Sequence, residues 1–289
     1  GTVKATGLAD DPLDLTADDD PRHALVDWMS GANNKFFAHT LVNRYWKHFF
    51  SRGLVEPEDD MRETNPAVNP DLLEALAQHF IKSEFDMKDL IRTICQSKTY
   101  QLSSIPNEFN AKDKTYFSRY YPKRLNAEVL YDAINQMTGS QASFSGLPVG
   151  TRAVQLPDNS FNSQSYFLTV FGRPDSSSSC ECERSSDASL AQSLHLLNSK
   201  DIQNKLASGS GRAATMAKDA EVKEEDKIRK LFMLAFSREP SGSEVLLARQ
   251  HLDRVTKDDK GAEKPVDKKL SYEDIIWALF NTKEFLFNH

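Results

Sequence analysis

Apolar residues recur at helical spacing through much of the first half of the chain. The run over 21–30 follows Asp20, a good N-cap residue, and begins with Pro21, which suits the first helical position. A longer run, "KFFAHTLVNRYWKHFFSRG", has Asn33 or Asn34 as its cap and Gly53 as its end. Its apolar stripe is formed by Phe37, Leu41, Tyr45 and Phe49. Both runs predict amphipathic helices.

Three more helices are predicted before residue 140. Asn69-Pro70 opens one, with Leu72, Leu73, Leu76 and Phe80 on its buried side. The segment "DMKDLIRTICQSKTY" repeats the pattern with Met87, Leu90, Ile91 and Ile94. The next runs from Pro122 to Met137, is closed by Thr138-Gly139, and turns Leu125, Val129 and Ile134 inward.

The periodicity fails between Ser140 and Asp187, where Gly, Pro, Ser and Asn dominate. One apolar run there, "SYFLTVFG", predicts a strand or a buried extended segment. Helices resume with "ASLAQSLHLLNS", which Asp187 can cap, and with "SKDIQNKLAS". A low-complexity stretch at 208–217 and a charged loop at 257–269 separate the last helices, and Ser271 is the expected cap of the closing one.

This pattern predicts a mainly α fold. We expect residues 1–20 to be an acidic linker and residues 21–289 to form a single, mostly helical domain. Its helical halves, 21–139 and 188–289, would flank an irregular, loop-rich segment at about 140–187 that holds at most a short strand or two.

The composition agrees with an ordinary globular protein. Of the 289 residues, 39% are hydrophobic and 27% are charged, and the net charge is −6. The acidic balance argues against nucleic acid as a partner. No apolar run is long enough for a membrane span, and the polar start predicts no signal peptide in this sequence.

Cys180 and Cys182, in "SSSSCECERSSD", form the first candidate site. The Cα atoms of two cysteines one residue apart can approach closely enough for a local disulfide, and packed thiols are an alternative. A zinc site would need further ligands, of which only Cys95 and His195 are available, and Glu183 disfavours a reactive thiolate. A structural clasp is the preferred interpretation, with no metal bound.

Arg124, Glu128 and Asp132 form the second candidate, because they follow one another at i, i+4 and i+8 on the helix predicted from Pro122. Such ladders are usually surface ion pairs. An enzyme could instead use Glu128 and Asp132 as a carboxylate pair, since neighbouring acids push their pKa values apart.

Helix 35–53 carries a third cluster, His39, Asn43 and Trp46, which could bind a ligand but fits hydrogen-bonded core residues better. The sequence has no HExxH, GxSxG, Walker or dinucleotide-binding motif, and no haem attachment motif. We therefore predict no cofactor, and the question of enzymatic activity stays open.

Five blocks keep a recognisable order along the chain. They are the segment "NKFFAHTLVNRYWKHFFSRG" with its continuation to "TYQLSS", then "KRLNAEVLYDAINQMTG", "FGRPDSSSSCECERSSDASLAQSLHLLNS", "LFMLAFSREPSGSE" and "WALFNTKEFLFNH". Together they resemble the DUF1553 domain, also called PSD1, over about residues 21–289. The family often has a "HPELL"-like block where this chain reads "NPDLL", so Asn69 stands in place of a histidine.

The resemblance implies a part of a large planctomycete or verrucomicrobial protein with DUF1549 and cytochrome-c-like modules. It implies an exported, extracytoplasmic location near redox or polysaccharide-degrading systems, and no established activity for the domain. The matching CECER block implies a structural part for Cys180, Cys182, Glu183 and Arg184, and export favours the disulfide.

Two functions are therefore weighed. The preferred one is a structural or interaction module that docks other domains of the parent protein or a co-encoded protein. The alternative is a hydrolase or redox-associated enzyme acting on glycans, with its site where the irregular middle meets the helices. Its catalytic candidates are Glu128, Asp132, Arg173, Glu183 and Arg184.

Overall fold

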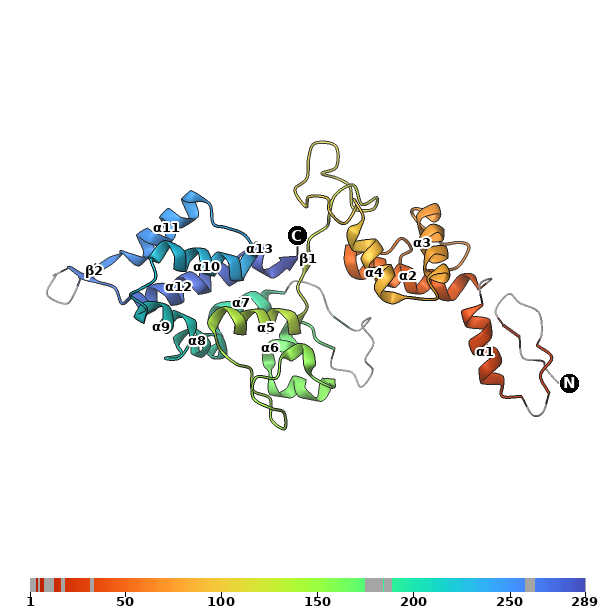
Figure 1. Cartoon of the computed structure of the whole chain (residues 1–289), viewed down its shortest axis with the longest axis horizontal. Helices are drawn as coiled ribbons and strands as arrows, with labels where there is room; N and C mark the ends of the chain where they lie inside the picture. Colours follow the sequence, from red (N-terminus) through yellow and green to blue (C-terminus); the bar gives the residue numbers. More distant parts are fainter. Residues whose placement is uncertain are drawn as a thin grey trace. The chain divides into compact units, whose positions relative to one another are not determined.

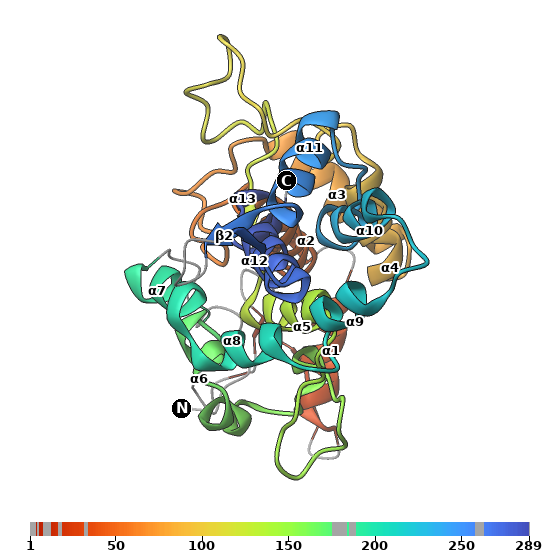
Figure 2. The ribbon, with the colours of Figure 1, turned by 90° about the vertical axis from the view of Figure 1, so that its left-hand side faces the viewer.

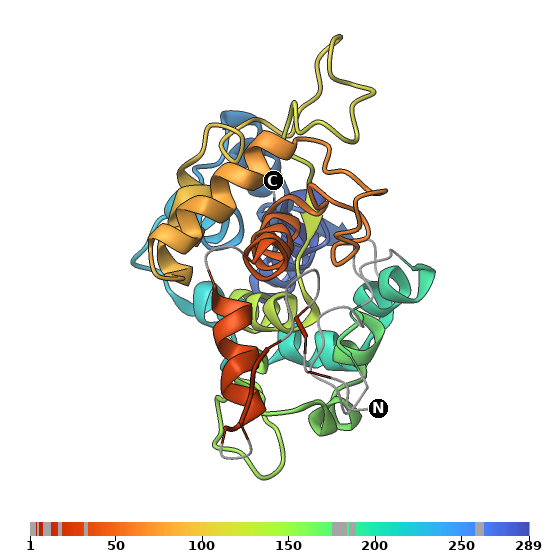
Figure 3. The ribbon, with the colours of Figure 1, turned by 90° about the vertical axis from the view of Figure 1, so that its right-hand side faces the viewer.

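The described part of the chain is mainly α-helical, as predicted (Figure 1; Figures 2 and 3 give the two side views). The computed structural model describes residues 4, 6–7, 13–16, 19–31, 34–174, 184, 189–257 and 263–288. The chain divides into two compact units, Gly1–Lys123 and Arg124–Asn288, each with its own apolar core. The division therefore falls well before residue 140, where the composition changes. One folding domain over 21–289 stays a prediction.

Unit 1 is built around one long helix. Its elements are α1 (Pro21–Ser30), α2 (Lys35–Phe50), α3 (Pro70–Lys82) and α4 (Met87–Gln96). Helix α2 packs against the other three, and α3 also packs against α4. The predicted caps are present: Asp20 accepts from the Arg22 N–H, Asn34 caps α2, and Asn69 caps α3 through the Leu72 N–H. Asn69 thus has a structural task as the cap of α3.

The buried stripe of α2 is displaced by one residue from the predicted one. The buried side chains are Ala38, Val42, Trp46 and Phe50, whereas Phe37, Leu41, Tyr45 and Phe49 are half-buried. The apolar face of this helix is two residues wide, so periodicity alone does not identify its centre. The helix also ends earlier than predicted, at Ser51, which has a φ of 65°.

Unit 2 is assembled on two central helices, α5 and α12. Its helical elements are α5 (Ala127–Thr138), η1 (Ala153–Gln155), η2 (Asn159–Gln164), α6 (Tyr166–Val170), α7 (Leu190–Asn198), α8 (Lys200–Ala207), α9 (Arg212–Lys218), α10 (Glu224–Phe236), α11 (Gly242–Leu252), α12 (Lys268–Phe280) and α13 (Lys283–Leu286). Helices α8, α9 and α10 contact both central helices, and α5 contacts α12 directly. Figure 2 shows α5, α8 and α9 below α12.

The strands are short, and they pair in twos. Strand β1 (Lys123–Arg124) pairs with β4 (Phe287–Asn288), and β2 (Val255–Lys257) forms an antiparallel hairpin with β3 (Glu263–Pro265). The hairpin occupies part of the region predicted as a charged loop. Among the helices of the described ranges, none is both long and apolar enough to cross a bilayer.

The apolar run "SYFLTVFG" is a helix, and the predicted strand or extended segment is wrong. Its buried residues are Phe167, Leu168 and Phe171. This i, i+1, i+4 pattern fits a helical face, because a strand would bury alternate residues. The Phe167 and Phe171 rings stack one turn apart, with their centroids 4.2 Å from each other. A run this short does not separate helix from strand in the sequence alone.

Several predicted boundaries also move. Helix α5 begins at Ala127 instead of Pro122, and Val129 is exposed while Leu130 is buried. The low-complexity stretch holds α9. Helix α12 is capped by Asp267, and Ser271 lies fully buried inside it. Ser189 caps α7 in a capping box, whereas Asp187, the predicted cap, lies outside the described residues.

Asn43 of α2 fixes the loop that follows the helix. The side chain is fully buried; its Nδ2 donates to the carbonyls of Val55 (2.9 Å) and Glu58 (2.8 Å), and its Oδ1 accepts from the Val55 N–H (3.0 Å). Gly53 permits this approach, because a Cβ atom there would lie 2.4 Å from the Val55 carbonyl oxygen. Asn43 is therefore a core residue rather than part of a ligand site, as the preferred interpretation has it.

The variant Asn43→Ala should lower the free energy of unfolding by about 3 kcal/mol, because buried backbone groups of the loop would lose their partners. Chemical denaturation measures this. Arg44→Ala is the matched control on the same helix: it removes an exposed ion pair to Asp59 and should cost about 1 kcal/mol or less. Equal losses in the two variants would contradict the assignment of Asn43 as the structural residue.

Candidate functional site

A largely buried carboxylate, that of Glu128, binds two arginines at the start of α5. Arg184 donates to it through both terminal nitrogens, at 2.8 and 3.0 Å, and Arg173 Nε donates at 3.2 Å. All three side chains are at most 15% exposed. Glu128 also lies in the first turn of its helix, where a negative charge is favoured by the helix dipole.

The electrostatics of Glu128 follow from this geometry. Burial by itself raises the pKa of the carboxyl, but the hydrogen bonds from Arg184 and the charges of both arginines outweigh it, so the pKa is lowered. The group is therefore ionised wherever the protein is folded at ordinary pH. A general acid needs the opposite shift, toward neutrality.

Arg173 links the Glu128 carboxylate to the irregular segment. Besides Glu128, its guanidinium donates to Asn162 Oδ1 (3.0 Å) and to the Asp158 carbonyl (3.1 Å). Asn162, itself buried, donates to the Pro174 carbonyl at 2.8 Å. These contacts fasten the segment from residue 158 to residue 174 against α5, so Arg173 has a clear structural task.

The predicted helical ladder of Arg124, Glu128 and Asp132 is not formed, because Arg124 lies on β1, before α5 begins. Its guanidinium contacts Gln192 Oε1, donates to the Phe171 carbonyl at 3.3 Å, and lies over the Phe171 ring. Gln192 in turn donates to the Val170 carbonyl at 3.1 Å. Arg124 thus helps to join β1, α6 and α7.

Asp132 accepts two backbone N–H groups, those of Ala153 (2.7 Å) and Val154 (3.2 Å). It therefore caps the 3₁₀ helix η1, whose first N–H groups have no partner within the helix. Glu128, one turn earlier on α5, binds different partners. The two carboxylates therefore share no partner: Glu128 binds arginines, and Asp132 binds backbone N–H groups.

The predicted catalytic residues are thus only partly brought together. Glu128, Arg173 and Arg184 meet, Asp132 binds elsewhere, and Glu183 lies outside the described residues. Cys180 and Cys182 also lie outside them, so the disulfide stays a prediction. Within the described ranges, no cluster of three His, Cys, Asp or Glu side chains is arranged to hold a metal ion.

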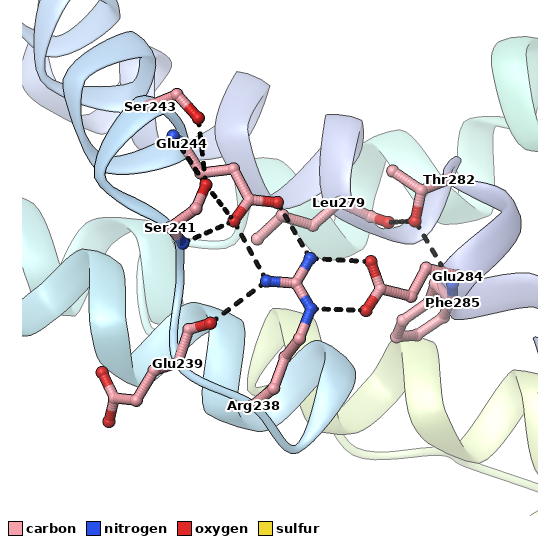
Figure 4. Close-up of polar contacts among 9 residues, drawn as sticks. All are labelled: Arg238, Glu239, Ser241, Ser243, Glu244, Leu279, Thr282, Glu284 and Phe285. Carbon is pink, nitrogen blue, oxygen red and sulfur yellow. Dashed lines mark hydrogen bonds and ion pairs between the residues drawn. The ribbon is translucent and has the colours of Figure 1, made fainter. Parts of the chain in front are cut away.

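Arg238 is the centre of a second polar network, which the sequence analysis missed (Figure 4). It follows α10 and lies between Glu244 of α11 and Glu284 of α13. Its Nε and Nη2 donate to Glu284 (2.6 and 2.8 Å), while Nη2 and Nη1 donate to Glu244 (2.9 and 3.0 Å). Nη1 also donates to the Glu239 carbonyl at 3.1 Å.

These contacts satisfy all five N–H donors of the Arg238 guanidinium. Glu284 and Glu244 raise its pKa, and Arg238 is the main cause that lowers the pKa of Glu244 to about 2. Glu244 also accepts from the Ser241 N–H (2.7 Å) and hydroxyl (2.9 Å) in a capping box. In the sequence, the spacing of Ser and Glu in "SGSE" is the signal for this capping box and thus for part of the network. No donor of Arg238 is left for a ligand anion.

The variant Glu128→Gln should lower the free energy of unfolding by about 3 to 5 kcal/mol, because it leaves two largely buried arginines without their counter-charge. Chemical denaturation measures this loss of unfolding free energy, as a lower midpoint with an unchanged dependence on denaturant concentration. Glu221→Gln, which removes an exposed carboxylate before α10, is the control and should change stability by about 0.5 kcal/mol or less. If Glu128→Gln were as stable as the control, Glu128 would not be a structural anchor.

The contribution of Glu244 to the free energy of unfolding should decrease as the pH falls. Its pKa is lowered from 4.5 to about 2 in the folded protein, so its stabilisation is complete above pH 4.5 and is lost as the pH falls toward 2. The difference in unfolding free energy between the parent protein and Glu244→Gln should therefore shrink over this interval. A difference that stays constant or grows on acidification would contradict the assignment.

The comparisons with known proteins identify a family but no characterised relative. No curated protein matches the chain, and no solved structure does. One family matches residues 21–252, and its description reads "PSD1: Protein of unknown function (DUF1553)". The match includes the CECER block and the Arg238 network except Glu284, and ends before the last two helices. The chain belongs to the PSD1 (DUF1553) family.

Proposed function

We propose that this chain is a helical interaction module of a larger extracytoplasmic protein, and that it docks another domain of that protein or a co-encoded partner. The observation that carries the proposal is an open apolar groove on unit 2, between α11 and α12. Its volume is about 320 Å³. The apolar residues that line it are Phe232, Leu247, Ala248, Ile275, Ala278 and Leu279.

The groove has features of a helix-binding surface. Leu247, at 69% exposed, adjoins the other apolar residues of the groove, and contiguous exposed apolar surface is typical of interaction sites. The polar lining comes from His251, Asp274 and Glu244. Asp274 is paired with His251 and with Arg254, and Glu244 with Arg238, so the polar groups are already satisfied. An amphipathic helix could then place one or two apolar anchors between α11 and α12.

The alternative, a hydrolase or redox-associated enzyme on glycans, has no supporting observation among the described residues. The pKa of the Glu128 carboxyl is lowered by two arginines, whereas an acid catalyst needs a raised one, and both oxygens of Asp132 accept hydrogen bonds from the backbone of η1. Function has to be argued from a site, and the groove between α11 and α12 is lined mostly by apolar residues. The interaction module is therefore the function we propose.

The proposed location outside the cytoplasm rests on the family resemblance. In such a compartment Cys180 and Cys182 would form a disulfide, which is our proposal for the CECER block. The proposed partners are the modules that accompany this domain in its family. Their docking would use unit 2, because the groove lies within it.

The variant Leu247→Asp should abolish co-purification of this chain with the remaining domains of its parent protein, expressed separately. A charge in the groove would lose apolar burial and carry an unpaired carboxylate into the interface, so the affinity should fall by at least about tenfold. Pull-down and titration calorimetry measure this.

Val149→Asp is the matched control, because Val149 is an exposed apolar residue of the same unit outside the groove. It should leave binding unchanged. Failure of the unaltered chain to bind any domain of the parent protein, or equal losses in the two variants, would overturn the proposed function.

A further inference from the structure

The segment that joins α4 to β1, residues 97–122, displays large apolar side chains to solvent. Ile105 is 77% exposed, Phe109 90% and Tyr116 75%. We call residues 97–122 the display loop. It projects beyond the helices of unit 1 in all three views, where it is the yellow trace without helices (Figures 1, 2 and 3). Apolar groups of this size usually mark a binding surface when they are exposed together.

The display loop is anchored in the core of unit 1. Phe117 and Tyr120 are buried, and the Phe117 ring packs against Trp46 and Phe50 with centroid distances of 5.4 and 5.6 Å. The Tyr120 hydroxyl donates to the Phe49 carbonyl at 3.2 Å. The loop therefore contains buried aromatic residues, which anchor it to the core of unit 1, and exposed ones, which face solvent.

Internal hydrogen bonds also hold the projecting part in shape. Asp113 accepts from the N–H groups of Thr115, Tyr116 and Ser118, at 2.9, 2.9 and 3.0 Å. Burial raises the pKa of Asp113, but the hydrogen bond from the Ser118 hydroxyl and these backbone bonds outweigh it, so the pKa is strongly lowered. Asn107 accepts from the Phe109 N–H at 3.0 Å. The turns that carry Phe109 and Tyr116 are thus built by side chains of the loop itself.

The charge of the display loop is opposite to that of the chain. Its cations are Lys98, Lys112, Lys114 and Arg119, and its acids are Glu108 and Asp113, which gives a net charge of +2 against −6 for the whole sequence. Lys112 and Lys114 are exposed, and neither forms an ion pair with any residue that the structure describes. Asp113 is turned into the loop, which leaves Glu108 as its exposed carboxylate.

We infer that the display loop binds the surface of an anionic lipid bilayer. Ile105, Phe109 and Tyr116 would enter the interface between headgroups and acyl chains, while Lys112 and Lys114 would contact anionic headgroups. A bilayer fits these observations because the apolar side chains sit on a projecting loop instead of lining a groove. The binding is peripheral and independent of the groove proposed on unit 2.

Sedimentation of the full chain with vesicles tests this. The chain should bind phosphatidylcholine vesicles that contain phosphatidylglycerol, and should bind pure phosphatidylcholine more weakly. Phe109→Ser should lower the partition coefficient about tenfold, because burial of a Phe side chain in an apolar environment strengthens binding by about tenfold or more. Lys112→Gln with Lys114→Gln should weaken binding to the anionic vesicles and reduce its salt dependence.

Val149→Ser is the matched control: it removes an apolar side chain of unit 2 that is 76% exposed, and it should leave the partition coefficient unchanged. Circular dichroism checks that each variant keeps its helices. Absence of binding to anionic vesicles at low salt would overturn the inference, as would a Phe109→Ser variant that binds like the parent protein. Binding of a single-stranded oligonucleotide through Phe109 and the two lysines, without vesicle binding, would assign the loop to nucleic acid instead.

Discussion

The polar organisation of unit 2 depends on one constraint, the charge of a largely buried carboxylate. Glu128 cannot stay ionised away from water without counter-charges, and it receives them from Arg173 and Arg184. Those arginines lie 45 and 56 residues further along the chain. Satisfying one side chain of α5 therefore positions the segment from 158 to 174 and brings Arg184 of the CECER block to the same helix. The same contact explains how three of the catalytic candidates from the sequence, Glu128, Arg173 and Arg184, come to pair with one another.

Arg238 is the centre of a second polar network in the same unit. By satisfying its five donors with Glu244, Glu284 and a carbonyl, it ties the end of α10 to α11 and α13. The orientation of α11 determines the groove against α12, and Glu244 is shared by the network and the groove. The groove that we propose for docking thus adjoins a polar network in which all five donors of Arg238 are already used.

The sequence predicts the helices well where capping and periodicity agree. Asp20, Asn34 and Asn69 mark the starts of three helices, and amphipathic segments of this kind predict the mainly α fold. Prediction from the sequence fails where contacts between distant segments determine the local structure. The short run around Phe167 is too brief to separate helix from strand. The partners of Glu128 lie too far away in sequence for any helical spacing to reveal them. The ladder from Arg124 was wrong because Leu125 and Asn126 are not helical. The pairing of Arg238 with Glu284, 46 residues further along the chain, likewise leaves no local pattern in the sequence.

We propose that the polar candidate residues of this PSD1 protein are structural anchors and that its function lies in apolar surfaces. Carbon-13 NMR titration of the Glu128 carboxyl tests this claim most directly, with assignment through the Glu128→Gln variant. The account predicts a pKa below 4.5, the ordinary value of a glutamate, because the two arginines outweigh the effect of burial. A pKa raised well above 4.5 would show a carboxyl that is kept neutral, as an acid catalyst is, and would contradict the account.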